Sequence, residues 1–201
     1  MDAVLCTERL AMRPLTVAYR PEMLELYSDP QVTRFLKPLD EDGHVRRLRE
    51  TEEMWASRGY GRVAVHDRGT GRFLGRGGLH HWPQFDEVEV GWALRVDAWG
   101  HGYATEASGA WVRWAFEHLD VPYVTACIDP ENAGSLAVAD RLGMSVLRED
   151  RLHGRAVIVF AAHRPTLSAS PDLRGCGNAD DCGMTLWSPE RKPGQQRPSS
   201  D

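Results

Sequence analysis

The segment Trp99–Ala107 (WGHGYATEA) has the composition of an anion-binding turn. It follows the strand-like run Val88–Leu94 and opens an amphipathic helix that we expect to extend to about Leu119. A strand that turns through glycines into a helix presents free backbone N–H groups at the positive end of the helix dipole. Gly100 and Gly102 lack a Cβ atom, so an anion can approach the backbone closely. The segment therefore predicts a binding site for a phosphate-bearing cofactor.

Two other phosphate-binding motifs match this turn less well. A P-loop would close with Gly-Lys-Ser or Gly-Lys-Thr, and no such sequence closes the turn. A dinucleotide site would need a third glycine and an acidic residue about twenty positions further on. An ordinary helix start after a glycine turn is the alternative that needs no ligand. Glu106, in the first helical turn, complements the helix dipole and is placed to bond back to the turn.

The charge and hydropathy of the chain limit the classes of partner that we expect it to bind. The 201 residues carry a formal net charge of −5 and include no basic block, so we expect no nucleic-acid partner. No apolar run approaches membrane-spanning length, and charges interrupt the segment 1–15, where a signal peptide would have its apolar core. We therefore expect no membrane association.

The four cysteines are scattered along the chain and form no disulfide framework: Cys6, Cys127, Cys176 and Cys182. This pattern favours a reducing, cytoplasmic location. Cys176 and Cys182 lack partner ligands at metal-site spacing, and we predict no metal site. From about Pro165 the sequence is mainly Pro, Ser, Gly, Asp and Arg. We expect one domain over residues 1–164 and a disordered tail over 165–201, in a chain that is a monomer or a homodimer.

Hydrophobic periodicity predicts a mixed α/β fold with a central mixed sheet and helices on both faces. The expected order is β-α-α-β-β-β-α-β-α-β-β. Its elements are a strand at 9–15, helices at 19–28 and 43–57 (the second capped near Asp42), a hairpin of 62–67 and 73–79, a strand at 88–94, a helix at 103–119, a strand at 123–128, a helix at 133–142 ending at Gly143, and a hairpin of 146–150 and 155–162.

Four segments in this order resemble the GNAT acetyltransferase superfamily, most closely the branch with the ribosomal-protein N-terminal (alanine/serine) acetyltransferases. They are the opening TERL at Thr7–Leu10, the turn Trp99–Ala107, the sequence NAGS at Asn132–Ser135, and RLGM at Arg141–Met144. The resemblance extends over about residues 7–163. It implies a strongly twisted sheet whose fourth and fifth strands splay apart, with acetyl-CoA in the cleft between them.

The resemblance also implies which residues hold acetyl-CoA. Backbone N–H groups of the turn would bind the pyrophosphate, and these belong to Gly100, His101, Gly102, Tyr103, Ala104 and Thr105. The backbone of Trp92, Ala93 and Leu94 would bind the pantetheine arm like an added strand and polarise the thioester carbonyl. Trp99 stands where the family has Gln or Arg, so we expect a changed outer contact at that position.

Acetyl transfer needs a neutral amine, a base that takes its proton, and an acid that helps the thiolate leave. Glu89 is the leading base, because a carboxylate within an otherwise apolar strand of the cofactor cleft is unusual. Strand alternation places Glu87 on the same face, so Glu87 or a water relay stays open as the base. The alternative is that both glutamates are solvated on an open face of the sheet.

Many members of the wider superfamily use a tyrosine as the acid, but Ala139 stands at that position here. The resemblance to the branch therefore determines which residue we expect to be the acid. In the branch, Asn132 would bind the pantetheine amide or the acetyl carbonyl, and Ser135 would hydrogen-bond the CoA sulfur and donate a proton. Helix capping is the alternative for both. Cys127 offers a covalent acetyl-cysteine route, although a buried, inert thiol is favoured.

The predicted function is N-acetyltransfer from acetyl-CoA to a primary amine, on a protein N-terminus or a small molecule, by direct attack in a ternary complex. The acceptor side is expected at 30–60 and 80–87, with contacts from Arg34, Phe35, His80, His81, Trp82 and Glu87. Carboxylates there favour a cationic acceptor, while arginines and histidines dilute that signal. A catalytically silent acyl-CoA sensor and a scaffold that acts through its tail are the alternatives.

Overall fold

A computed structural model describes residues 4–152 and 154–165. The predicted tail lies outside the described residues apart from its first position, as do Cys176, Cys182 and the hairpin residue His153. In the described ranges, no helix combines the length and apolar character needed to cross a bilayer.

The centre of the molecule is one mixed sheet, in the order β1-β2-β3-β4-β5-β7-β9-β8, with β6 also paired to β4. The strands are β1 (Leu5–Cys6), β2 (Leu10–Pro14), β3 (Arg62–Asp67), β4 (Phe73–Trp82), β5 (Glu87–Val90), β6 (Ala93–Leu94), β7 (Tyr123–Ile128), β8 (Ser145–Leu152) and β9 (Arg155–His163). The pair β5–β7 is parallel and the other pairs are antiparallel. The predicted fold class is therefore confirmed.

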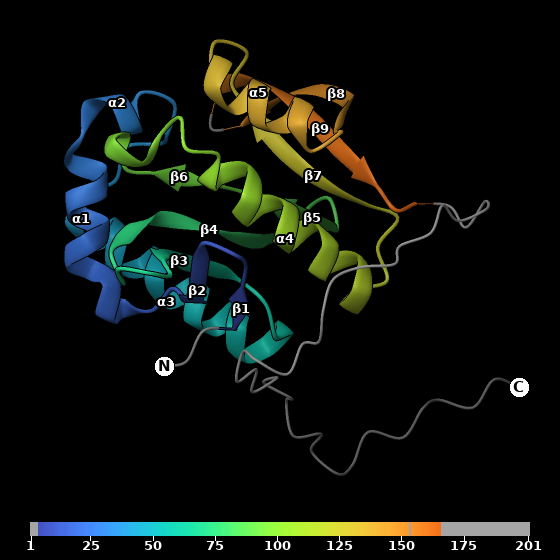
Figure 1. Cartoon of the computed structure of the whole chain (residues 1–201). Coiled ribbons are helices and arrows are strands. Elements are labelled where there is room, and N and C mark those ends of the chain that lie inside the picture. The colour runs from blue at the N-terminus through green and yellow to red at the C-terminus, as the bar shows by residue number, and fades with distance from the viewer. Residues whose placement is uncertain (1–3, 153, 166–201) are drawn as a thin grey trace, which may run out of the picture.

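Helices cover both faces of this sheet (Figure 1). They are η1 (Val17–Tyr19), α1 (Arg20–Ser28), α2 (Pro30–Thr33), α3 (Glu41–Arg58), η2 (Val96–Ala98), α4 (Tyr103–His118) and α5 (Ala133–Arg141). Alternation along β3 separates two cores. Val63 and Val65 join the cluster that contains Trp111 of α4, whereas Ala64 joins the cluster that contains Leu48 of α3.

Several details differ from the sequence prediction, among them the short helix α2, which was not predicted. The short strand β1 was not predicted, since two residues carry no periodicity. The N-cap of α3 is Asp40 rather than Asp42, because the Asp40 Oδ1 atom accepts a hydrogen bond from the N–H of Gly43 at 2.8 Å. The predicted strand 88–94 is interrupted between β5 and β6. Opposite this interruption, Gly78 has φ +96°, and a Cβ atom there would lie 2.6 Å from the carbonyl oxygen of Gly61.

The sheet opens beyond the middle of β5. Glu89 is level with Thr125 in the single register position that joins β5 to β7. After that point β6 stays on β4, where Ala93 is level with Arg76, while β7 continues along β9. The gap between β6 and β7 is therefore built into the register of the sheet.

Candidate active site

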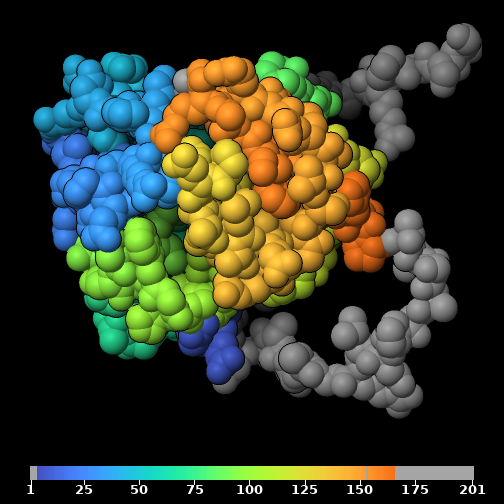
Figure 2. All heavy atoms as spheres, turned by 90° about the horizontal axis from the view of Figure 1, so that it is seen from above, coloured from blue at the N-terminus to red at the C-terminus, as the bar shows by residue number. Residues whose placement is uncertain are grey.

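A cavity of about 260 Å³ lies at this opening. Figure 2 shows the cleft above it, where blue N-terminal elements meet the yellow and orange α5, β8 and β9. The predicted site residues that line the cavity are Phe35, His80, Trp82, Glu89, Trp92, Asn132 and Ser135. Those that do not line it are Arg34, His81, Glu87, Ala93, Leu94 and the turn residues 100–105. The structure thus gathers the proposed base and acid in one cavity.

Glu89 is half-buried and held at both carboxylate oxygens. Its Oε2 atom accepts a hydrogen bond from the indole N–H of Trp82 at 2.7 Å, and its Oε1 atom accepts one from the backbone N–H of Cys127 at 3.3 Å. Each carboxylate oxygen has a further lone pair, so the group can still receive a proton. These bonds fix the carboxylate in the wall of the cavity.

Glu87 has a different environment from Glu89, although the two are on the same strand face. It is buried and forms a two-pronged ion pair with Arg148 of β8, with N···O distances of 2.7 and 2.8 Å. The hydroxyl of Tyr123 donates a further bond to it at 3.3 Å. This arrangement gives Glu87 a structural role in joining β5 to β8.

The other two predicted acceptor residues outside the cavity also have local partners. The His81 Nε2 atom lies 3.0 Å from Asp86, and the exposed Arg34 side chain lies 3.7 Å from Glu131. His80 lines the cavity. Its pKa is lowered to about 3, mainly by burial and next by the charge of Arg62, so the neutral form is favoured. A histidine with so low a pKa is a poor proton acceptor near neutral pH.

Asn132 is the N-cap of α5, and both Asn132 and Ser135 line the cavity. The Asn132 Oδ1 atom accepts a hydrogen bond from the N–H of Ser135 at 3.1 Å, which is the capping geometry. The Ser135 hydroxyl accepts a bond from the indole N–H of Trp92 at 3.2 Å. The capping oxygen belongs to Asn132 rather than to Ser135, and the Ser135 hydroxyl, which accepts one bond, keeps its own proton to donate.

Cys127 lines the cavity beside Glu89. Burial first, and then the nearby Glu89 carboxylate, raise the pKa of the thiol far above its ordinary value. Since the thiolate is the nucleophilic form, this environment opposes the covalent acetyl-cysteine route.

The turn before α4 has the form of an anion site. Gly100 has φ +76° and Gly102 has φ +78°, a left-handed conformation that glycine adopts without strain. The first helical hydrogen bond runs from the N–H of Glu106 to the carbonyl of Gly102. Among the described residues, no backbone carbonyl accepts a bond from the N–H groups of 100–105.

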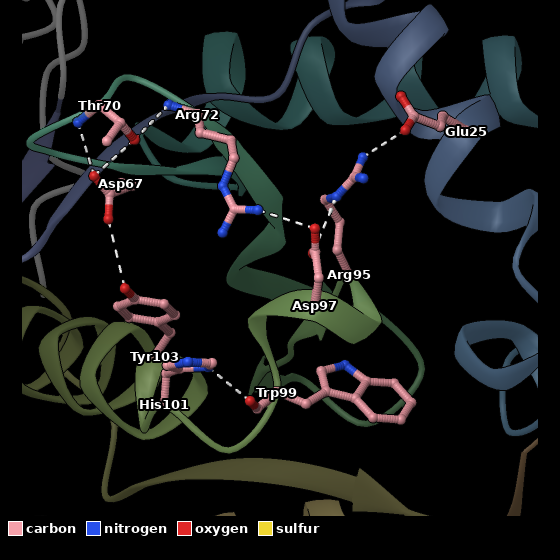
Figure 3. A network of polar contacts seen from close by, with 9 residues as sticks. All are labelled: Glu25, Asp67, Thr70, Arg72, Arg95, Asp97, Trp99, His101 and Tyr103. Atoms are coloured by element: carbon pink, nitrogen blue, oxygen red, sulfur yellow. Dashed lines mark hydrogen bonds and ion pairs between the residues drawn. The ribbon is translucent and has the colours of Figure 1, made fainter.

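The turn is braced by residues far away in the sequence. Glu106 binds the Thr7 hydroxyl at 2.5 Å and the Arg9 side chain at 2.7 Å, and Arg9 in turn donates to the carbonyl of His101 at 2.9 Å. Sequence analysis expected Glu106 to bond back to the turn itself; the bond passes through Arg9 instead. In Figure 3, the Tyr103 hydroxyl donates a hydrogen bond to Asp67 of β3 at 3.5 Å.

This bracing predicts a pH-dependent stability. Burial alone would raise the pKa of Glu106, but hydrogen bonds from Thr7 and Arg9 outweigh it and hold the pKa below its ordinary 4.5. A lowered pKa stabilises the fold above the unfolded-state pKa, and the stabilisation is lost as the pH falls through the folded-state pKa. We expect Glu106→Gln to lose about 1–2 kcal/mol at pH 7 and much less at pH 3, as measured by urea unfolding at both pH values. An equal loss at both pH values would contradict this account.

The backbone of β6 has free donors on the side of the opening. The N–H groups of Gly91 and Arg95 bond to β4, so strand alternation turns those of Trp92 and Leu94 toward the gap. Trp99, where the sequence departs from the family, donates its indole N–H to the carbonyl of Leu94 at 2.8 Å.

Comparison with known proteins identifies the family. The family described as "Acetyltransferase (GNAT) domain" matches residues 9–145. A curated relative, the Bacillus subtilis (strain 168) protein YkkB, is 30% identical over 167 residues, which are 78% of this chain and 93% of the relative. The chain therefore belongs to the GNAT acetyltransferase family, and it is an acyltransferase enzyme.

Solved structures agree with this assignment. An acetyltransferase from Agrobacterium tumefaciens str. C58 is 32% identical, with a TM-score of 0.72, over 80% of this chain and 94% of the other. The neighbours include RimL, a ribosomal L7/L12 α-N-protein acetyltransferase in complex with coenzyme A. RimL is 15% identical, with a TM-score of 0.68, over 81% of this chain and 98% of its own. At that identity the likeness concerns the fold.

Proposed function

We propose that this enzyme transfers an acetyl group from acetyl-CoA to a primary amine by direct attack of the amine. The observation that carries the proposal is the joint presence of Glu89 and Ser135 in one cavity at the opening of the sheet. A fixed carboxylate that can accept a proton and a hydroxyl that can donate one are the two groups that such a transfer uses.

The residues around the opening fit a CoA thioester. The N–H groups of the turn 100–105 suit a pyrophosphate at the positive end of α4. The Cβ position of Gly100 has no atom within 4 Å, which leaves space for a phosphate beside the backbone. The outward N–H groups of Trp92 and Leu94 match the amides of a pantetheine arm. When bound, acetyl-CoA supplies an activated acetyl group as a thioester.

The roles of the two side chains follow from their contacts. The amine nitrogen forms a bond with the acetyl carbon, the carbon–sulfur bond breaks, and Glu89 takes the proton that the nitrogen loses. Ser135 donates a proton to the departing sulfur and regains one from solvent. Trp92 holds the Ser135 oxygen by a hydrogen bond, which leaves the hydroxyl proton free for this task.

The acceptor is either a protein N-terminus, as in the RimL neighbour, or a small molecule. The loop over 35–38 and the aromatic rings of Phe35 and Trp82 line its side of the cavity. We place the enzyme in the cytoplasm, where acetyl-CoA is available and its cysteines stay reduced.

Thermal unfolding with and without acetyl-CoA tests the donor. At a hundred times its dissociation constant a ligand of the folded state adds about 2.7 kcal/mol. We expect the Tm to rise with acetyl-CoA and to stay unchanged with ATP or NAD at the same concentration. Absence of a shift with acetyl-CoA, in a cooperatively unfolding sample, would refute the proposed function.

A further inference from the structure

The cavity carries an excess of positive charge on the acceptor side. The basic residues that line it are Lys37, Arg47, Arg62, Arg76 and Arg155, and the acidic ones are Glu89 and Asp129. Asp129 forms an ion pair with Arg155, with an N···O distance of 3.1 Å. Glu89 is therefore the one carboxylate in the lining, within the described residues, without an ion-pair partner. The balance is opposite to the cationic acceptor that the carboxylates favoured in the sequence, and it follows the arginines that diluted that signal.

Three of these arginines form a cluster: Arg47 on α3, Arg62 on β3 and Arg76 on β4. Arg62 is level with Gly78 and Arg76 is level with Ala64, so the two arginines are diagonal neighbours on one face of the sheet. Such neighbours have Cα atoms roughly 7–8 Å apart. Gly78, between Arg76 and His80 on that face, has no side chain to separate them from the cavity.

No described carboxylate forms an ion pair with the cluster, although the charge of Glu89 acts on Arg62 from a greater distance. In the ranges 4–152 and 154–165, no carboxylate lies within 4.0 Å of the side chain of Arg47, Arg62 or Arg76. Arg76 donates a hydrogen bond to the hydroxyl of Tyr27 at 3.0 Å. Because half-buried like charges repel and lose solvation, an uncompensated cluster of this kind costs folding free energy.

The positive charge of the cluster shifts the pKa of one of its members, Arg62, and of the neighbouring His80. Burial, and then the charges of Arg76 and Arg47, lower the pKa of Arg62 to about 10, although Glu89 and Tyr27 act in the opposite direction. The charges that act on His80 are those of Arg62, Arg47, Arg76 and His81, all of them positive.

We propose that the acceptor is a small amine with an anionic oxygen group, a carboxylate or a phosphate, which binds the cluster of Arg47, Arg62 and Arg76 while its nitrogen points to Glu89. This inference rests on the proposed function and specifies its substrate. Arginine forks match the oxygen pairs of carboxylates and phosphates. An anion on the cluster supplies the missing counter-charge.

The same field assists the chemistry. The attacking amine must be neutral, and nearby positive charges disfavour its protonated form. Glu89 lies opposite His80 in the register of β4 and β5. The Glu89 carboxylate is therefore close to the positively charged arginines on the same face of the sheet. An acceptor held by its anion at the arginines thus presents its nitrogen to the single base.

Matched pairs of acceptors test the proposal. One arm compares the standard amino acids with their α-carboxamides, and a second compares phosphoethanolamine with ethanolamine. CoA release is measured with saturating acetyl-CoA. We expect kcat/KM to be at least tenfold higher for the anionic member of a pair, with the better arm identifying the anion as carboxylate or phosphate.

Two neighbouring arginines on α3 supply the variant and its control. Arg47→Gln removes a cluster charge, whereas Arg46→Gln removes an exposed charge whose partner, Asp40, lies at 3.8 Å outside the cavity. We expect Arg47→Gln to raise KM for the anionic acceptor at least tenfold and to leave KM for acetyl-CoA unchanged. Arg46→Gln is expected to change neither constant.

The possible results distinguish an error in the acceptor class from an error in the proposed acetyl transfer. Equal turnover of charged and uncharged acceptors, or turnover confined to N-terminal peptides, would overturn this inference and leave acetyl transfer standing. An acetyl-CoA-induced Tm rise without turnover in either arm would also overturn it. No binding of acetyl-CoA would overturn the proposed function and this inference together.

Discussion

Glu89→Gln is expected to lower kcat by about 10²–10⁴-fold, the usual contribution of a positioned general base. Glutamine preserves the size of the side chain and keeps an oxygen that can accept the bond from Trp82, so the cavity wall is retained. It cannot take the proton of the amine. The rate of the variant should therefore rise with pH as the free amine loses its own proton, and steady-state assays between pH 6 and 10 would show this.

Glu87→Gln is the matched control, two positions away on the same strand face. It weakens the ion pair with Arg148 and is expected to lower the Tm, while kcat stays within a few-fold of the parent. In both variants the Tm rise with acetyl-CoA should persist. If Glu89→Gln keeps its activity, or if Glu87→Gln loses as much, Glu89 is not the base.

The pattern along the strand could not distinguish these two glutamates. Both alternate with buried valines, so sequence analysis placed them on one face and favoured Glu89 as the base while leaving Glu87 open. What separates them is a partner on β8: Arg148 is 61 residues from Glu87, and its bond depends on a sheet order that brings β8 and β9 beside β7. Long-range pairing of this kind leaves no periodic signal in the sequence.

Local signals predicted the elements better than the contacts between them. Strand β7 has the predicted bounds, since alternation and flanking turns mark it clearly. The break between β5 and β6 was missed because the apolar pattern of 88–94 continues through it, while the strand pairing does not. The arginine cluster was missed for a related reason: Arg47, Arg62 and Arg76 come from three elements, and only the register of β3 and β4 places two of them together.

The turn before α4 gives the second large effect. Gly100→Asp is expected to weaken acetyl-CoA binding about thirtyfold relative to Gly100→Asn. Both residues tolerate the left-handed conformation at φ +76°, and the Cβ position is open, so their steric cost is the same. They differ by one negative charge. A unit charge roughly 8 Å from a phosphate, at an effective dielectric constant of about 20, costs about 2 kcal/mol, which is about thirtyfold in Kd.

Titration calorimetry of both variants with acetyl-CoA measures this difference, and repetition at 0.5 M salt tests its origin. Because added salt screens exposed charges, the gap between the two variants should narrow as the salt rises. Their kcat values at saturating acetyl-CoA should match, since the turn lies outside the cavity that holds Glu89 and Ser135. Equal affinities at low salt would mean that the pyrophosphate binds elsewhere, because a charge at Gly100 cannot be indifferent to an anion held by the adjacent N–H groups.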